Sequence, residues 1–166
     1  MAMNCGPVDH AVQSPVITLI VFDIDGQRYA LPLHDVERVL PMVAVSPLPQ
    51  APAVVLGVMN LHGQVIPVLD LRRHFGLPIR DYGLTARLLV IRTSRRILTL
   101  AVDEVLGVRE IAQETITRPD ALLSGIGHVA GIVTLADGLL FIHDVEACLS
   151  LDEEQRLTTA LEGIGV

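Results

Sequence analysis

Residues 57–71 read GVMNLHGQVIPVLDL, and residues 131–145 read GIVTLADGLLFIHDV. The two stretches align without a gap, and their identical residues are Gly57, Leu61 and Asp70, which recur as Gly131, Leu135 and Asp144. Apolar residues also occupy matching positions between these anchors. We infer that the chain contains a duplicated small β unit, in which each copy is a strand, a tight turn and a second strand.

The composition favours a β-rich protein. Apolar residues make up 51% of the chain and aromatic residues only 3%, so branched aliphatic side chains must fill the core, and these favour strands. A length of 166 residues indicates one domain, or two small subdomains that share a core. The net charge of −7 argues against nucleic-acid and anionic-membrane partners. The longest apolar runs are shorter than the roughly 18 residues of a membrane span, and the N-terminal residues lack the features of a signal peptide. We therefore expect a cytoplasmic protein without direct membrane insertion.

Turn signals divide each half of the chain into hairpins. Asp25-Gly26 joins strands expected at 16–24 and 27–33, because Asp-Gly readily adopts the positive φ angles of a two-residue turn. His62-Gly63 and Asp137-Gly138 join the strands of the two repeat copies, and residues 93–95 join a further pair. Residues 34–40 are expected to form a turn of helix that Pro41 ends, and residues 107–127 a connecting stretch.

Short helices follow the hairpins. Asp70 and Asp144 each precede a short helical stretch as N-caps, and Gly76 ends the first of these. Ser150 and Glu153 have the spacing of a capping box for a C-terminal helix, part of which we expect to dock on a barrel. Two five-stranded sheets of this kind would leave open edges, which closure into barrels removes. We predict a mainly β fold of two small five-stranded barrels, with a flexible N-terminal segment (1–15), the domain itself (16–150, soft boundary near residue 80) and a C-terminal helix (151–166).

Motifs that could carry chemistry are sparse. HDVE occurs at 34–37 and at 143–146, but the two copies are out of phase in the repeat, whereas a duplicated metal site would recur in phase. GIGHVAG (125–131) follows a polar loop and precedes a strand, unlike a dinucleotide-binding loop. Cys5 and Cys148 make neither a disulfide framework nor a metal site. We expect no enzymatic activity and no cofactor; a metal-dependent enzyme that uses His34 and His143, and a binder of a small ligand, are the alternatives.

At residues 60–78, NLHGQVIPVLDLRRHFGLP, the chain resembles the CheW family of bacterial chemotaxis adaptors. These proteins carry a similar Asn-Leu-Arg-Gly, Val-x-Pro-Val-x-Asp-Leu-Arg and Phe-Gly-x-Pro series. The stretches VFDIDGQRYALPLHDVERVL (21–40), LPQAPAVVLGVMNL (48–61) and LAVDEVLGV (100–108) are also similar, so that the resemblance covers about residues 17–150.

The resemblance implies two SH3-like five-stranded barrels around a shared hydrophobic core. It also implies a non-catalytic chemotaxis adaptor that couples the cytoplasmic tips of chemoreceptors to a histidine kinase through the regulatory domain of that kinase. An adaptor of a divergent chemosensory pathway, in surface motility or second-messenger signalling, with a different receptor set, is the alternative.

The resemblance further implies binding residues. Those expected in a receptor groove are Val36, Arg38, Val39, Val58, Asn60, His62, Val102 and Val105, and those in a loop that helps to contact the kinase are Arg118 and Leu122. Each valine could instead belong to the core, and Asn60 could bond to the backbone of its turn. We assign Gly57, Gly63, Gly76 and Asp70 to architecture, as a bend, a turn, a helix stop and a cap.

Two positions depart from the family pattern. Arg38 stands where the family's Val-x-Glu-Val series has glutamate, and His62 stands where Asn-Leu-Arg-Gly has arginine. Imidazole does not reproduce the five-donor fork of arginine. We hypothesise a rewired polar contact to a divergent receptor set; the alternative is that both are exposed rim positions of small energetic weight.

Overall fold

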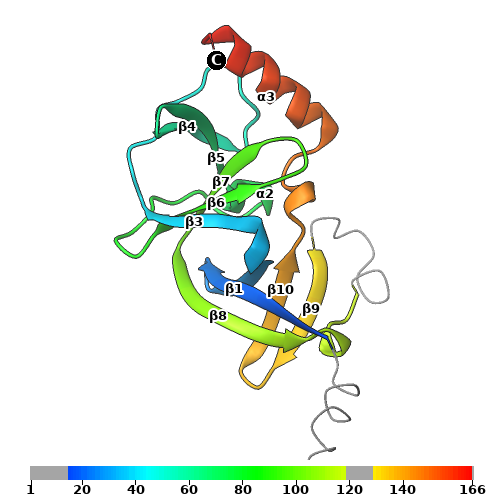
Figure 1. The fold of residues 1–166 in the computed structure, drawn as a ribbon. Helices are drawn as coiled ribbons and strands as arrows, with labels where there is room; N and C mark the ends of the chain where they lie inside the picture. The colour runs from blue at the N-terminus through cyan, green and yellow to red at the C-terminus, as the bar shows by residue number, and fades with distance from the viewer. Residues whose placement is uncertain (1–14, 119–128, 166) are drawn as a thin grey trace, which may run out of the picture.

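The computed structural model describes residues 15–118 and 129–165, which form two five-stranded β-sheets with short helices and a C-terminal helix (Figure 1). The first sheet has the order β8-β1-β2-β10-β9, with β1 (Val16–Ile24), β2 (Gln27–Pro32), β8 (Glu104–Ala112), β9 (Val129–Leu135) and β10 (Gly138–His143). The second sheet has the order β3-β6-β7-β5-β4, with β3 (Val36–Pro41), β4 (Val55–Leu61), β5 (Gln64–Asp70), β6 (Arg87–Arg92) and β7 (Ile97–Val102).

The hairpin turns form largely where the sequence predicts them. Asp25-Gly26 has φ angles of 55° and 84°, and His62-Gly63 has φ angles of 53° and 83°. Both pairs therefore adopt the left-handed conformations that a tight hairpin requires. The turn between β9 and β10 lies one residue earlier than predicted, because Leu135 pairs with Gly138.

The two halves of the chain exchange their first hairpins. The β1–β2 hairpin joins the sheet of β8, β9 and β10, whereas the β6–β7 hairpin joins the sheet of β3, β4 and β5. A parallel pair makes each connection, with Ala30 of β2 opposite Ile142 of β10 and Leu69 of β5 opposite Leu100 of β7. A boundary near residue 80 thus separates the sequence halves but divides both sheets, since each sheet contains strands from both halves.

Single bridges extend the edge of each sheet. Ser46, which follows β3, donates its N–H to the Val58 carbonyl over 2.9 Å and accepts from the Val58 N–H over 2.8 Å. Thr117, which follows β8, exchanges the same bonds with Ile132 of β9. In each sheet, the segment that follows one edge strand thus pairs with the edge strand on the other side of that sheet. Each sheet is therefore partly closed into an SH3-like barrel, because these bridges join its two edges at one point and not along their full length.

Two predicted segments differ from the structure. Residues 34–40 were expected as a turn of helix; only Leu33–Asp35 is helical, as one 3-10 turn, and β3 begins at Val36 because its backbone pairs with β6. Residues 107–127 were expected to be a connection, but β8 (Glu104–Ala112) extends into this stretch as far as Ala112 and pairs with β1. Exposed polar side chains and Gly107 hide the strand pattern of β8, because much of that strand faces solvent.

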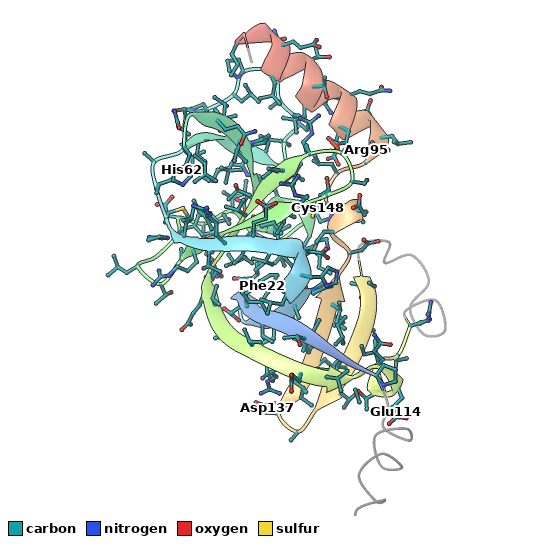
Figure 2. All side chains as sticks on the ribbon, viewed as in Figure 1. Phe22, His62, Arg95, Glu114, Asp137 and Cys148 are labelled. Atoms are coloured by element: carbon teal, nitrogen blue, oxygen red, sulfur yellow. The ribbon has the colours of Figure 1, made fainter. Side chains whose placement is uncertain are left out.

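The expected shared hydrophobic core is present. One central cluster combines Phe22 and Leu31 of the first sheet with Leu89 and Leu100 of the second sheet. In Figure 2 the Phe22 side chain lies between the two sheets. Two smaller clusters lie within the individual sheets. The mainly β fold with paired SH3-like units around one core is therefore confirmed.

The C-terminal helix completes the core. α3 (Leu151–Gly163) buries Leu157 and Leu161 in the central cluster. The Arg96 Nε, in the β6–β7 turn, donates to the buried Glu154 carboxylate over 2.8 Å. The shorter α2 (Leu71–His74) begins at Asp70, whose side chain accepts the Arg72 N–H. None of the helices in the described ranges is long and apolar enough to cross a membrane.

Ser150→Ala is expected to lower the free energy of unfolding by about 1 kcal/mol. The Ser150 hydroxyl accepts the Glu153 N–H over 3.1 Å and the Glu153 carboxylate accepts the Ser150 N–H, so the substitution removes one arm of a capping box. Urea-induced unfolding measures the change. Thr159→Ala is the control, because the Thr159 hydroxyl only donates to the Gln155 carbonyl within the same helix. An equal loss in both variants would contradict the capping role.

Candidate functional site

An exposed face of β3 carries the best candidate for docking. β3 is an edge strand that pairs only with β6, and Val39 on it is 41% exposed. Val36 of β3 and Val105 of β8 are half-buried and both pack against the central cluster. The shared core therefore reaches the surface beside an exposed valine, which is an arrangement suited to an apolar contact with a partner.

Arg38 and His62, the two positions that depart from the family pattern, contact each other. The Arg38 Nη1 lies 2.9 Å from the His62 Nε2, and both side chains are exposed. Arginine only donates hydrogen bonds, so Arg38 is the donor and the His62 Nε2 the acceptor in this contact. Arg38 lies on β3 and His62 in the turn between β4 and β5 of the same sheet, and Figure 2 shows His62 at the periphery of that sheet. Sequence spacing alone did not reveal this contact.

The remaining receptor-groove candidates divide by burial. Asn60 is exposed, and its Oδ1 accepts the Gly63 N–H over 2.8 Å, so its side chain stabilises the hairpin turn. Val58 and Val102 are buried in the central cluster, where they cannot present side chains to a partner. Arg118 is exposed and directly follows the Thr117 bridge, whereas Leu122 lies outside the described residues.

The sequence did not identify two exposed apolar residues of β8 as candidate binding residues. Leu106 is 47% exposed and Val108 is 55% exposed, on the same edge strand as Val105. A shift in the β1–β8 register between Val21 and Phe22 disturbs the alternation of side chains in this segment. The signal in the sequence was the run of branched residues at 105–111, which Gly107 interrupts.

A polar network links α2 to the junction of β7 and β8. Arg72 of α2 is only 3% exposed, forms an ion pair with Asp103, and donates to the Arg80 carbonyl over 3.0 Å. Its guanidinium carbon lies 4.2 Å from the centre of the Tyr82 ring. Asp103 also accepts the Asp25 N–H over 2.7 Å, and so connects the network to the β1–β2 turn. The Asp-Leu-Arg motif and the Val-Asp-x-Val motif thus meet, and they hold the two sheets together.

Two further residues complete this network. The Tyr82 hydroxyl donates to Asp70 Oδ1 over 2.6 Å, and burial together with this bond raises the pKa of Tyr82 above its usual range. Arg80 forms an ion pair with Asp25 across the sheet boundary. These contacts join side chains of the protein to one another, and we assign the network to architecture.

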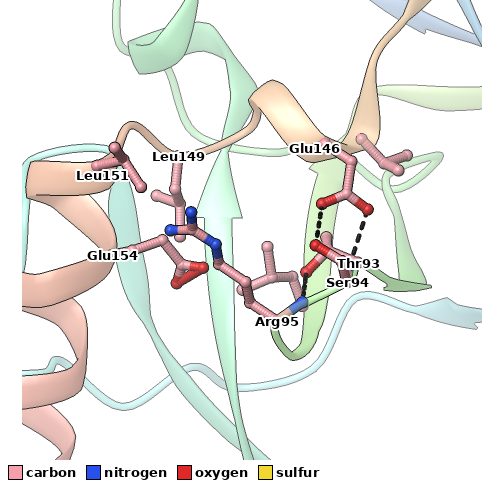
Figure 3. Close-up of a pocket in the computed structure, with 9 residues that line it drawn as sticks. Thr93, Ser94, Arg95, Glu146, Leu149, Leu151 and Glu154 are labelled. Carbon is pink, nitrogen blue, oxygen red and sulfur yellow. Dashed lines mark hydrogen bonds between the residues drawn. The ribbon is translucent and has the colours of Figure 1, made fainter.

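A small polar hollow of about 210 Å³ lies between the β6–β7 turn, the 3-10 turn Val145–Ala147 and the start of α3 (Figure 3). The Glu146 carboxylate accepts the Ser94 N–H over 2.8 Å and the Ser94 hydroxyl over 2.7 Å. Figure 3 shows the Arg95 side chain extending over the hollow. These hydrogen bonds between Ser94 and Glu146 connect the β6–β7 turn to the chain before α3.

The two HDVE motifs lie in different environments. His34 is exposed and 3.3 Å from Asp35, whereas His143 is buried and Asp144 accepts the Glu146 N–H as a helix cap. No group of three or more His, Cys, Asp or Glu side chains in the described part of the chain could hold a metal ion. Burial, with Asp144 and Glu146 nearby, raises the pKa of the Cys148 thiol to about 12, so this thiol is protonated and unreactive at neutral pH.

The chain matches known proteins over most of its length. The CheW-like domain matches residues 18–153. The chemotaxis protein CheW of Helicobacter pylori is 31% identical over 138 residues, covering 82% of this chain and 84% of that protein. Protein FrzA of Myxococcus xanthus is 34% identical over 98 residues, covering 59% of this chain and 61% of that protein.

A solved structure agrees with the fold described above. The scaffolding protein TtCheW from Thermoanaerobacter tengcongensis superposes with a TM-score of 0.77 at 26% identity, covering 84% of this chain and 96% of that one. Together with the match of the family over residues 18–153, these findings show that the chain belongs to the CheW-like family of chemotaxis adaptors.

Proposed function

We propose that this protein is a non-catalytic chemotaxis adaptor that couples the helical cytoplasmic tip of a chemoreceptor to the regulatory domain of a histidine kinase. The observation that carries the proposal is the exposed edge strand β3, which presents Val39 on one face and the contact between Arg38 and His62 on the other. A partner that docks along this edge can bury the apolar side chain for affinity and use the polar pair for orientation. The proposed role places the protein in the cytoplasm, at receptor arrays, through its partners.

Coupling requires two contacts at once, and the fold offers two separate sheets for them. The receptor contact lies on the second sheet and the adjoining β8, with Val36, Arg38, Val39, His62 and Val105 as its side chains. We place the kinase contact around Arg118, which follows the bridge of Thr117 to β9; the other kinase candidate, Leu122, lies outside the described residues. An adaptor of this kind needs no catalytic residue, since many weak contacts in an array give the assembly its stability.

Val39→Asp is expected to weaken binding to a receptor-tip fragment at least tenfold, because it places a charge on the apolar centre of the proposed contact. The fold should tolerate the change, since Val39 is 41% exposed. Isothermal titration with a soluble receptor tip from the same organism measures the affinity, and urea unfolding checks stability.

The matched control is Leu139→Asp, which alters an apolar side chain of similar exposure, 45%, on β10 of the other sheet. This variant should bind the receptor tip with unchanged affinity. Equal loss in both variants would show that the β3 face is not the contact. If the unaltered protein binds neither a receptor tip nor the kinase regulatory domain in co-sedimentation, the proposed function itself is wrong.

A second candidate is an adaptor of a divergent chemosensory pathway with a different receptor set. The contact of Arg38 with His62 favours it, because a guanidinium and an imidazole stand where the family pattern has an acid and an arginine. Affinity for receptor tips of several pathways, measured side by side, distinguishes the two candidates.

A further inference from the structure

Arg38 presents a positive charge that nothing in the described part of the chain neutralises. Its guanidinium bonds to the His62 Nε2, and none of the ion pairs formed by the described residues involves it. Arginine has five N–H donors, so most of those of Arg38 face solvent. The adjacent Glu37 is already paired with Arg92 over 2.6 Å and is not its partner.

His62 holds that charge in place. Its backbone has a φ of 53° in a turn that Gly63 completes with a φ of 83° and that the Asn60 side chain stabilises. The imidazole therefore projects from a well-defined turn and fixes one N–H of the arginine. A guanidinium held in this way loses less conformational freedom when a partner binds.

The surroundings indicate which partner would be attracted. Val39 follows Arg38 on β3 and points to the opposite face of the strand, so a partner that docks along this edge meets an apolar residue on one face and a cation on the other. A cation at a contact steers a partner that carries a negative charge there. A carboxylate matches the planar fork of a guanidinium.

We propose that Arg38 binds an aspartate or glutamate of the chemoreceptor tip, and that His62 is a positioning residue that orients Arg38 for this contact. The pair thereby selects receptors that carry a carboxylate opposite β3. This inference rests on the proposed function and names the receptor chemistry that the site recognises.

The test measures affinity for the cytoplasmic tip fragment of a receptor from the same organism. Arg38→Gln should weaken binding about three- to fivefold and reduce the salt dependence of the affinity, and Arg38→Glu should weaken it more than tenfold. Glu37→Gln, which changes the neighbouring charge on the same strand, should alter affinity less than twofold. An Arg38→Glu variant with unchanged affinity would overturn the proposal.

A double-mutant cycle identifies the carboxylate. Each Asp and Glu of the receptor tip is changed singly to the corresponding amide, and one of these changes should weaken binding as much as Arg38→Gln does. Combining that change with Arg38→Gln should cause no additional loss. If no carboxylate of the tip is coupled to Arg38, the assignment fails.

His62→Asn tests the positioning role. Asparagine tolerates the positive φ of the turn but is too short to keep the contact with Arg38. It should weaken binding about twofold in the unaltered protein and have no effect in the Arg38→Gln background. An equal effect in both backgrounds would show that His62 acts independently of Arg38. Because Val39→Asp weakens binding whichever way these results fall, failure of this inference is distinguishable from failure of the proposed function.

Discussion

Arg72→Met is expected to lower the free energy of unfolding by about 3–5 kcal/mol. Methionine replaces much of the buried volume of Arg72 but leaves the Asp103 carboxylate without its cation. Asp103 is 19% exposed and also receives the Asp25 N–H, so the uncompensated charge lies where two sheets meet. The shift of the urea midpoint, with an unchanged slope, measures the loss.

An exposed ion pair on α3 provides the control. Arg156 lies 3.7 Å from Asp152, with both side chains mostly exposed, so Arg156→Met should cost no more than about 0.5 kcal/mol. Comparable losses in the two variants would contradict a special role for the network around Arg72. The additional change Asp103→Asn in the Arg72→Met background should recover part of the stability, since it removes the unpaired charge.

Gly57→Ala is expected to destabilise the protein by about 3 kcal/mol. A Cβ atom at residue 57 would lie 2.2 Å from the Ser46 carbonyl oxygen and 2.7 Å from Val45 Cγ1. The backbone around Ser46 must move to admit it, and this weakens both hydrogen bonds that Ser46 exchanges with Val58. Thermal and urea unfolding measure the effect.

The second copy of the repeat contains the matched control. A Cβ atom at Gly131 would lie 2.5 Å from Ile116 Cγ2, a side-chain atom, and no closer than 3.8 Å from the Thr117 carbonyl oxygen. Because a side chain moves more easily than a backbone carbonyl, Gly131→Ala should cost clearly less than Gly57→Ala. A larger loss at Gly131 would show that the approach of Ser46 is not the cause.

Local signals predicted most of the secondary structure. Asp25-Gly26 and His62-Gly63 form turns because few residue pairs adopt two positive φ angles, and Asp70, Asp144 and Ser150 cap helices because their side chains accept nearby N–H groups. β3 and β8 were not predicted. Each is an edge strand with many exposed side chains, so partners distant in the sequence decide its conformation.

The candidate site was predicted only in outline. The family resemblance indicated Val39, Arg38 and His62, which are exposed on neighbouring parts of the second sheet. It could not show that Val58 and Val102 are buried, because valine occupies cores and interfaces alike. The contact between Arg38 and His62 and the ion pair between Arg72 and Asp103 each join residues far apart in the sequence, so both depend on the tertiary fold.

The sequence by itself determined the repeat, the hairpins, the helix caps and the family, because each depends on residues close together or on a motif. Only the tertiary structure decided that each half contributes its first hairpin to the sheet of the other half. Parallel pairing of β2 with β10 and of β5 with β7 makes that exchange, and no local pattern encodes which distant strand a hairpin will join. Burial of both sheets against one central cluster determines which strand each hairpin joins. In this arrangement Phe22, Leu31, Leu89 and Leu100 are removed from water together.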